Sequence, residues 1–107
     1  MTWQHLAVES DEVVTRITLD RPEVRNALSE GLMVELTAAL RAATGRVVVL
    51  AGNGPCFSAG HDLAELASGD AADHTRLFEV CAGLMDAVTS IDQPVIAEVH
   101  GVATAAG

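Results

Sequence analysis

The chain has 107 residues, within the usual range of a single domain, and half of them are hydrophobic, so they can supply one apolar core. Its formal net charge of −9 argues against partners such as nucleic acids or an anionic membrane surface. The two cysteines, Cys56 and Cys81, are too few for a disulfide framework or a zinc site. Neither a signal sequence nor an apolar run long enough to span a bilayer is evident, so we expect a soluble cytoplasmic protein.

The first expected element is a β-hairpin. Residues 3–9 and 12–19 alternate in polarity and are rich in β-branched side chains, with a polar break between them. The second run ends at Arg21 and Pro22, because proline lacks an N–H group and restricts the residue before it to extended conformations. Residues 23–28 are expected to form a surface loop.

An amphipathic helix is predicted over residues 29–44. Ser29 is a good N-cap, Glu30 suits the first turn, and apolar residues then repeat at steps of three and four up to Gly45, a typical C-terminal stop. Residues 46–51 form the next expected strand. A strand, a helix and a strand in this order predict a parallel pair with a right-handed crossover.

The second half of the chain continues the same alternation. Small residues between positions 52 and 62 predict a turn, residues 63–67 a short helix, and the acidic stretch 68–73 a mobile surface loop. A second amphipathic helix follows, and its apolar face carries Leu77, Val80, Leu84, Val88 and Ile91. Residues 95–99 form the last expected strand, so the fold class is α/β.

The stretch from Cys56 to Leu63 offers two side-chain chemistries. Ser58 stands as in the second half of a G-x-S-x-G nucleophile elbow, with Cys56 in place of the first glycine, so a serine hydrolase is one alternative. His61 has the ring of a general acid or base, although an exposed structural histidine is equally consistent. The other histidines show no ligand spacing with it, so no metal site is expected.

A third interpretation uses the backbone. The turns at residues 59–62 and 104–107 each follow a predicted strand of the same sheet and consist mainly of small residues. Two N–H groups converging from such turns on one oxygen would form an oxyanion hole. The alternative is that small residues merely allow close packing, and spacing alone does not decide between the two.

Four segments together resemble the amino-terminal part of the enoyl-CoA hydratase/isomerase, or crotonase, superfamily. In the family's order they are Ile17–Leu28, Val47–Gly52, Phe57–Leu63 and Pro94–Ala103. The resemblance implies a crotonase-like fold, a spiral of ββα units, of which residues 1–107 are the incomplete amino-terminal portion of one domain.

The resemblance also implies a substrate and a site. The substrate would be an acyl-CoA thioester, with coenzyme A as part of the substrate and no separate cofactor. The N–H groups of His61 and Ala106 would form the oxyanion hole and stabilise an enolate-like state. The implied substrate-binding residues are Val24 and Arg25 along the CoA moiety, together with Ala59, Gly60, Asp62, Leu63, Ala64 and Gly107. Full-length members would assemble as homotrimers or hexamers.

Several positions depart from the family pattern. Ala64 stands where lysine is common, which leaves Arg25 to cover a phosphate contact, and the methyl groups of Ala105 and Ala106 should narrow the pocket. Glu98 is an unusual acid in an apolar strand, for which we expect an exposed edge or a satisfied polar contact.

The family's two catalytic glutamates lie beyond the second oxyanion turn, so we expect a chain truncated before them. One hypothesis is therefore a hydratase or isomerase of fatty acid metabolism seen as its amino-terminal piece. The other is a catalytically incompetent protein that binds CoA esters or another subunit. The reaction type and the acyl chain are left open.

Overall fold

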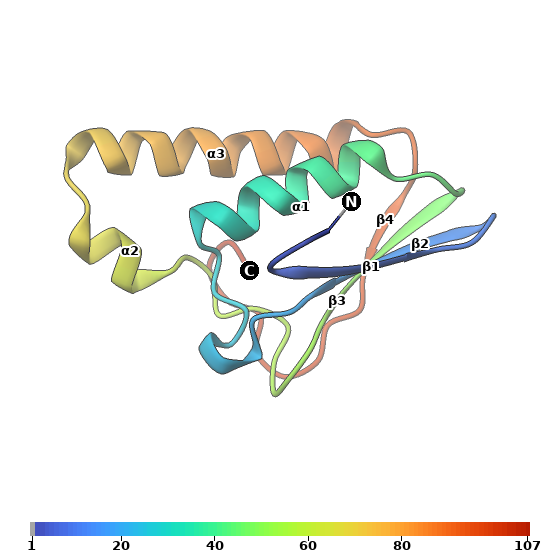
Figure 1. Cartoon of the computed structure of the whole chain (residues 1–107), viewed down its shortest axis with the longest axis horizontal. Helices are drawn as coiled ribbons and strands as arrows, with labels where there is room; N and C mark the ends of the chain where they lie inside the picture. The colour runs from blue at the N-terminus through green and yellow to red at the C-terminus, as the bar shows by residue number, and fades with distance from the viewer. Residues whose placement is uncertain (1) are drawn as a thin grey trace.

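A four-stranded sheet forms the base of the molecule (Figure 1). The computed structural model describes residues 2–107. The strands are β1 (Leu6–Ser10), β2 (Val14–Leu19), β3 (Val47–Gly52) and β4 (Val95–Ala97), and they lie side by side in this order. β1 and β2 pair antiparallel, whereas β2 with β3 and β3 with β4 pair parallel. The predicted hairpin and the predicted parallel pair are therefore confirmed.

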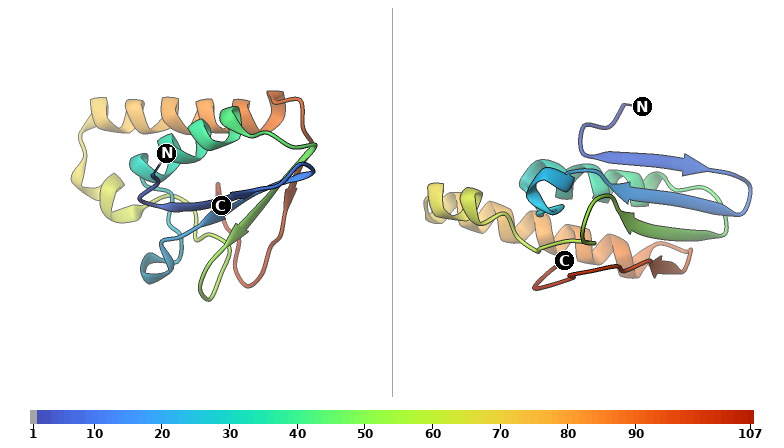
Figure 2. Two further views of the ribbon diagram at one scale, coloured as in Figure 1. Left: turned by 45° about the vertical axis from the view of Figure 1, so that its right-hand side comes forward. Right: turned by 90° about the horizontal axis from the view of Figure 1, so that it is seen from below.

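The helices are η1 (Pro22–Val24), a 3-10 turn, followed by α1 (Glu30–Ala42), α2 (Leu63–Ser68) and α3 (Ala71–Ser90). The two long helices, α1 and α3, cover one face of the sheet (Figure 1). Seen from below, α1 lies behind the first strands and α3 behind the last ones (Figure 2). None of the helices formed by residues 2–107 has the length and the apolar character needed to cross a membrane.

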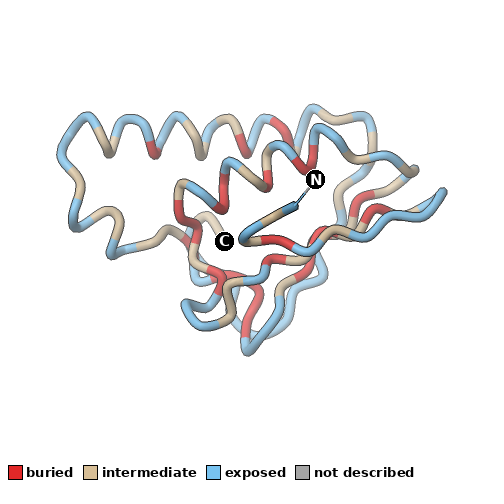
Figure 3. Tube along the Cα trace, viewed as in Figure 1, coloured by how far each residue is buried: buried red, intermediate tan, exposed pale blue. Residues whose placement is uncertain are grey.

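The core lies between the sheet and the two long helices (Figure 3). Alternate residues of β2 and β3 are buried there, including Ile17 and Val48, and they meet Leu32, Met33 and Leu40 of α1. This alternation is what a sheet with one covered face requires. The burial decreases toward β4, where Ile96 is exposed.

Several of the predicted boundaries are wrong; β1, for example, begins at Leu6 and not at residue 3. Residues 68–73 are not all loop, because α3 begins at Ala71 behind the N-cap Asp70. Asp70 and Asp73 form a reciprocal capping box, in which each carboxylate accepts a backbone N–H of the other residue. Apolar periodicity predicts helices by their buried face, and the first turn of α3 has no such face.

The last strand ends earlier than predicted, at Ala97. Glu98 leaves the strand and forms an ion pair with Arg16 of β2 at 2.7 Å, while its N–H donates to Leu50. The Arg16 guanidinium holds the pKa of the Glu98 carboxyl below its ordinary value. The expected satisfied polar contact for this acid is therefore confirmed.

Candidate active site

Two turns lie against each other beyond the carboxyl ends of β3 and β4. The backbone at Ser58 pairs with that at Ala103 in a parallel bridge, and the Ser58 N–H donates to the carbonyl of Val102 at 3.2 Å. Thr104 returns two bonds, from its N–H to the Ser58 carbonyl at 3.2 Å and from its hydroxyl to the Ala59 carbonyl at 3.1 Å. The structure thus brings together the two turns singled out by the sequence, residues 59–62 and 104–107.

Gly60 makes this close approach sterically possible. Its φ is +87°, a region that side chains disfavour. A Cβ atom at this position would lie 2.7 Å from the carbonyl oxygen of Thr104 and 3.0 Å from the Cβ of Ala105. Any other residue would therefore force the two turns apart.

The N–H of His61 points away from the scaffold. The carbonyl of Gly60, in the same peptide unit, accepts the N–H of Leu28 at 2.7 Å. The peptide is trans, so its N–H points opposite to that carbonyl. On the other side, Asp62 donates to the Leu28 carbonyl at 3.2 Å. Within the part of the chain that the structure describes, the His61 N–H donates to no acceptor.

The second turn, Thr104 to Gly107, presents a comparable amide. The Gly107 N–H closes the turn on the Thr104 carbonyl at 2.8 Å. Of the two central residues only Ala105 has a positive φ, +50°, which matches a type II′ turn. The Ala106 N–H belongs to the central peptide and donates to no acceptor among residues 2–107. Holding alanine in the left-handed region costs about 1–2 kcal/mol, a kind of strain that is concentrated at functional sites.

A hollow of about 510 Å³ opens at these turns. Its lining comes from both turns, from α2 and from the loop before α1: Ala27, Ala59, His61, Leu63, Leu66 and Ala105. Leu63, at the start of α2, is largely exposed beside it. No carboxylate appears in this lining, so the hollow offers apolar contacts and the His61 ring.

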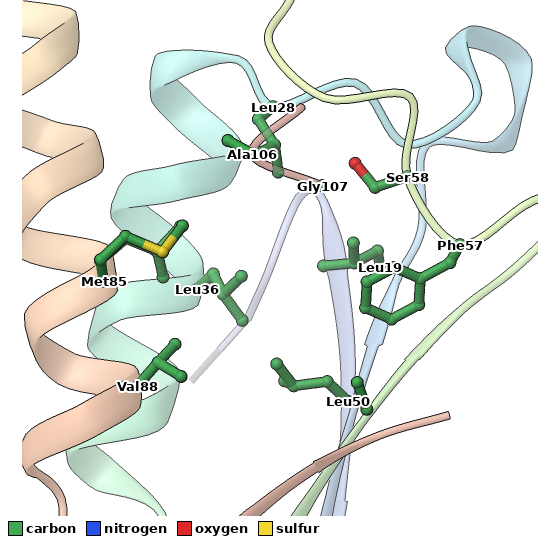
Figure 4. Close-up of a pocket in the computed structure, with 12 residues that line it drawn as sticks. Leu19, Leu28, Leu36, Leu50, Phe57, Ser58, Met85, Val88, Ala106 and Gly107 are labelled. Carbon is green, nitrogen blue, oxygen red and sulfur yellow. The ribbon is translucent and has the colours of Figure 1, made fainter. Parts of the chain in front are cut away.

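A separate apolar pocket of about 180 Å³ lies on the inner side of the second turn (Figure 4). Ala106 and Gly107 meet Ser58 there, with Leu36 of α1, Met85 and Val88 of α3, and Leu19, Leu50 and Phe57 from the sheet side. Gly107 fits because a Cβ would lie 2.6 Å from the Ser58 hydroxyl. The second turn therefore borders both cavities.

The remaining predicted substrate residues are more dispersed. Asp62 caps α2 by accepting the Glu65 N–H at 3.2 Å and lies 3.6 Å from the Arg21 guanidinium, so its carboxylate is used in the scaffold. Val24 and Ala64 are exposed but line neither cavity at the turns.

Arg25 lines a further depression of about 280 Å³. Its neighbours there include Cys56, Ala59 and Val102. It belongs to a cluster of three arginines within ten residues of the sequence, Arg16, Arg21 and Arg25. Arg16 and Arg21 form ion pairs with Glu98 and Asp62. Among residues 2–107, Arg25 is the member of that cluster without an ion pair. It is therefore the arginine beside the turns that can meet an anion.

The nucleophile-elbow alternative gains no support. Ser58 is buried, and its hydroxyl donates to the Asn26 carbonyl at 2.9 Å and accepts the Gly60 N–H at 3.2 Å, so it is a structural group rather than an exposed nucleophile. Residues 2–107 contain no cluster of three or more His, Cys, Asp or Glu side chains placed to hold a metal ion.

Sequence reasoning missed Asn26. The segment 23–28 was expected to be a surface loop, but Asn26 is completely buried and Leu28 nearly so. The φ of Asn26 is +53°, a value that asparagine tolerates better than most residues. That tolerance was the only signal in the sequence, and it is too common to identify a buried residue.

Known proteins that are similar to this chain fall in one family. The family model described as enoyl-CoA hydratase/isomerase matches residues 9–107. A Rhodobacter capsulatus protein named "Probable enoyl-CoA hydratase" is 42% identical over 109 residues. Among solved structures, an enoyl-CoA hydratase from Mycobacterium smegmatis superposes with a TM-score of 0.91 at 42% identity, covering 97% of this chain. The human enoyl-CoA hydratase domain-containing protein 3 superposes with a TM-score of 0.87 at 30% identity, covering 96% of this chain.

The match covers less than half of each relative. The chain spans 42% of the Rhodobacter capsulatus protein and 43% of both the mycobacterial and the human chains.

Proposed function

The chain belongs to the enoyl-CoA hydratase/isomerase family, and on that basis we propose that its two facing turns bind the thioester carbonyl of an acyl-CoA. Its fold is the amino-terminal portion of the family's α/β crotonase fold. The N–H groups of His61 and Ala106 would donate to the carbonyl oxygen. Such donors stabilise the negative charge that develops when the thioester becomes enolate-like.

The observation that carries this proposal is that each of the two facing turns contains at least one amide without an acceptor among residues 2–107. Neighbouring N–H groups in both turns are used: that of Gly60 by Ser58, that of Asp62 by Leu28 and that of Gly107 by Thr104. Three amides in these two turns donate to no acceptor in the described part of the chain, those of His61, Ala105 and Ala106, and the family resemblance names His61 and Ala106 as the donors. The bonded Gly60 carbonyl and the bonded Gly107 N–H fix the directions of these two amides. Donors that are fixed before the substrate arrives need no reorganisation during the reaction.

Arg25 would hold the phosphate end of coenzyme A. It lines a depression that also includes Ala59 of the first turn, so the thioester and the phosphates could occupy adjoining surfaces. A guanidinium binds phosphate by charge-assisted hydrogen bonds. The arginine also provides a local positive charge in a chain whose net charge is −9.

A second candidate function is binding without turnover. The hollow at the two turns has no carboxylate in its lining and the His61 ring as its single titratable side chain, whereas hydration of an enoyl thioester needs groups that both donate and accept protons. Under this alternative the chain binds CoA esters or another subunit and polarises the carbonyl without converting it.

An infrared experiment tests the proposal directly. Crotonyl-CoA carrying a ¹³C-labelled thioester carbonyl is added to the full chain, and we expect the carbonyl band to move to lower frequency on binding. An unshifted band at saturation would refute the oxyanion hole. Measuring the loss of the enoyl group by its ultraviolet absorbance separates the two candidate functions. Turnover favours the hydratase or isomerase, and a shifted carbonyl band without turnover favours the binding protein.

Replacing Arg25 tests the CoA assignment. We expect Arg25→Ala to weaken binding of acetyl-CoA about tenfold, the effect of losing roughly one charge-assisted hydrogen bond. Arg46→Ala is the matched control, because Arg46 is also exposed but precedes β3 at the opposite end of that strand from the turns. Equal losses of affinity in the two variants, measured by calorimetry, would contradict the assignment.

Assembly and location complete the proposal. We propose that the full-length protein forms a homotrimer or hexamer and acts in fatty acid metabolism in the cytoplasm. Sedimentation and cell fractionation of the full-length protein are the corresponding measurements.

A further inference from the structure

Asn26 connects the two segments that build the first turn. Its side-chain amide donates to three backbone carbonyls, those of Asn53 at 2.8 Å, Cys56 at 3.1 Å and Phe57 at 3.1 Å. Its side-chain oxygen accepts the Arg21 N–H at 2.8 Å. The side chain is fully buried and uses both its donors and its acceptor, so it joins the loop after β2 to the loop after β3.

A short series of hydrogen bonds leads from this residue to the His61 amide. The Asn26 carbonyl accepts the Ser58 hydroxyl at 2.9 Å, and that hydroxyl accepts the Gly60 N–H at 3.2 Å. The preceding carbonyl, of Arg25, accepts the Ala59 N–H at 3.0 Å. Three consecutive residues, 58 to 60, are thus tied to Arg25 and Asn26, and the next amide in the chain is that of His61.

The surroundings admit asparagine and few other side chains. The backbone has positive φ values at both Arg25 and Asn26, +54° and +53°, which disfavour β-branched and bulky residues. Gly52 leaves space for the amide, because a Cβ there would lie 3.0 Å from its nitrogen and 2.7 Å from the Phe57 carbonyl oxygen. An aspartate would face those carbonyls with acceptors only, and a glutamine would be one methylene too long for this space.

We infer that Asn26 is a positioning residue. Its side chain holds the two loops together, so that its backbone carbonyl meets the Ser58 hydroxyl, which in turn bonds the Gly60 N–H and fixes the direction of the His61 N–H. The effect of Asn26 on catalysis rests on the proposed function, whereas the hydrogen bonds that orient the His61 N–H are present without substrate. Buried hydrogen-bond networks of this kind hold one conformation because any alternative leaves polar groups unpaired.

The test uses the full chain without ligand first. Asn26→Gly removes the side chain and keeps a residue that tolerates positive φ. Asn53→Ala is the matched control: it removes an exposed asparagine side chain whose amide bonds Asp20 but keeps the carbonyl that Asn26 uses. Leu40→Ala destabilises the core within α1 and serves as a control for global stability.

Amide exchange and chemical shifts, measured by nuclear magnetic resonance, give the result. In Asn26→Gly we expect the Ala59 and Gly60 amides to exchange about tenfold faster than in Leu40→Ala at matched stability, and the His61 amide resonance to move. The control Asn53→Ala should leave all three unchanged. If Asn26→Gly does not fold, Ser58→Ala replaces it, because it removes the hydroxyl that joins the Asn26 carbonyl to the Gly60 N–H and should have the same effects on Gly60 and His61.

The two hypotheses fail in different experiments. Unchanged Gly60 exchange and His61 resonance in whichever variant folds would overturn the positioning role, even if wild-type chain shifts the thioester band. A wild-type chain that does not shift the band would refute the oxyanion hole and leave the role of Asn26 in orienting the amide intact. When both hold, the infrared shift of bound crotonyl-CoA should be reduced in Asn26→Gly or Ser58→Ala and retained in Leu40→Ala.

Discussion

Replacing His61 by proline removes the one hydrogen that the proposed hole takes from the first turn. Proline has no N–H, and the amide of His61 donates to no acceptor within residues 2–107, so the fold loses no internal hydrogen bond. The residue before it is Gly60, which has no Cβ and is therefore the least restricted by a following proline. His61→Ala is the matched variant, since it removes the ring and keeps the N–H.

The size of the effect follows from the role of the amide. A fixed donor to a developing oxyanion is worth about 3 kcal/mol, so any turnover should fall on the order of 10²-fold in His61→Pro. In the bound ground state the carbonyl is neutral, so binding of crotonyl-CoA should weaken only about tenfold or less. We expect His61→Ala to retain binding and turnover within about threefold, because the ring forms no hydrogen bond in the described structure.

The assay combines the infrared band of the labelled thioester with calorimetric affinity and thermal unfolding. His61→Pro should show a smaller band shift than wild type at saturating ligand, with an unfolding temperature close to that of His61→Ala. Equal band shifts in wild type and His61→Pro would refute the donor role of this amide. A reduced shift in His61→Ala would show instead that the imidazole acts on the substrate.

Three further predictions concern the scaffold. Gly60→Ala should destabilise the fold by about 2 to 4 kcal/mol in urea unfolding, because the added methyl group is strained at a positive φ and clashes with the backbone of Thr104. Gly83→Ala in α3, where no atom lies within 4 Å of the added Cβ, should instead stabilise the fold by about 0.5–1 kcal/mol. Changes of the same sign in the two variants would contradict the steric argument. Ala105→Gly should stabilise by about 0.5–1 kcal/mol by relieving a φ of +50°, and a loss of stability would show that the turn is unstrained. Glu98→Gln should be less stable than wild type near neutral pH, because the folded pKa of Glu98 lies below its ordinary value of 4.5 and the ion pair with Arg16 stabilises the fold above that pH. The difference should shrink as the pH falls through the lowered pKa, and a constant difference across acid titration would exclude the ion pair as its cause.

Much of the fold could be predicted because the signals were local. Ser29, Glu30 and the spacing of Leu32, Leu36 and Leu40 define α1, whose observed bounds differ from the prediction by one to two residues. The start of α3 was missed because its first turn is stabilised by the Asp70 capping box rather than by apolar contacts. Hydrophobic periodicity detects helices stabilised by apolar contacts and does not detect a turn stabilised by a capping box.

The candidate site divides along a similar line. The sequence by itself determined which turns contain small residues and glycines, and the resemblance carried by its motifs indicated His61 and Ala106 as donors. The tertiary structure decided that residues 59–62 and 104–107 touch and that only a glycine fits at position 60 between them. It also placed Asp62 in an ion pair with Arg21. It also decided the burial of Asn26, whose side-chain amide donates to carbonyls 27 to 31 residues away in the chain. Hydrogen bonds between such distant backbone groups depend on how two loops pack, so no local pattern of residue types records them.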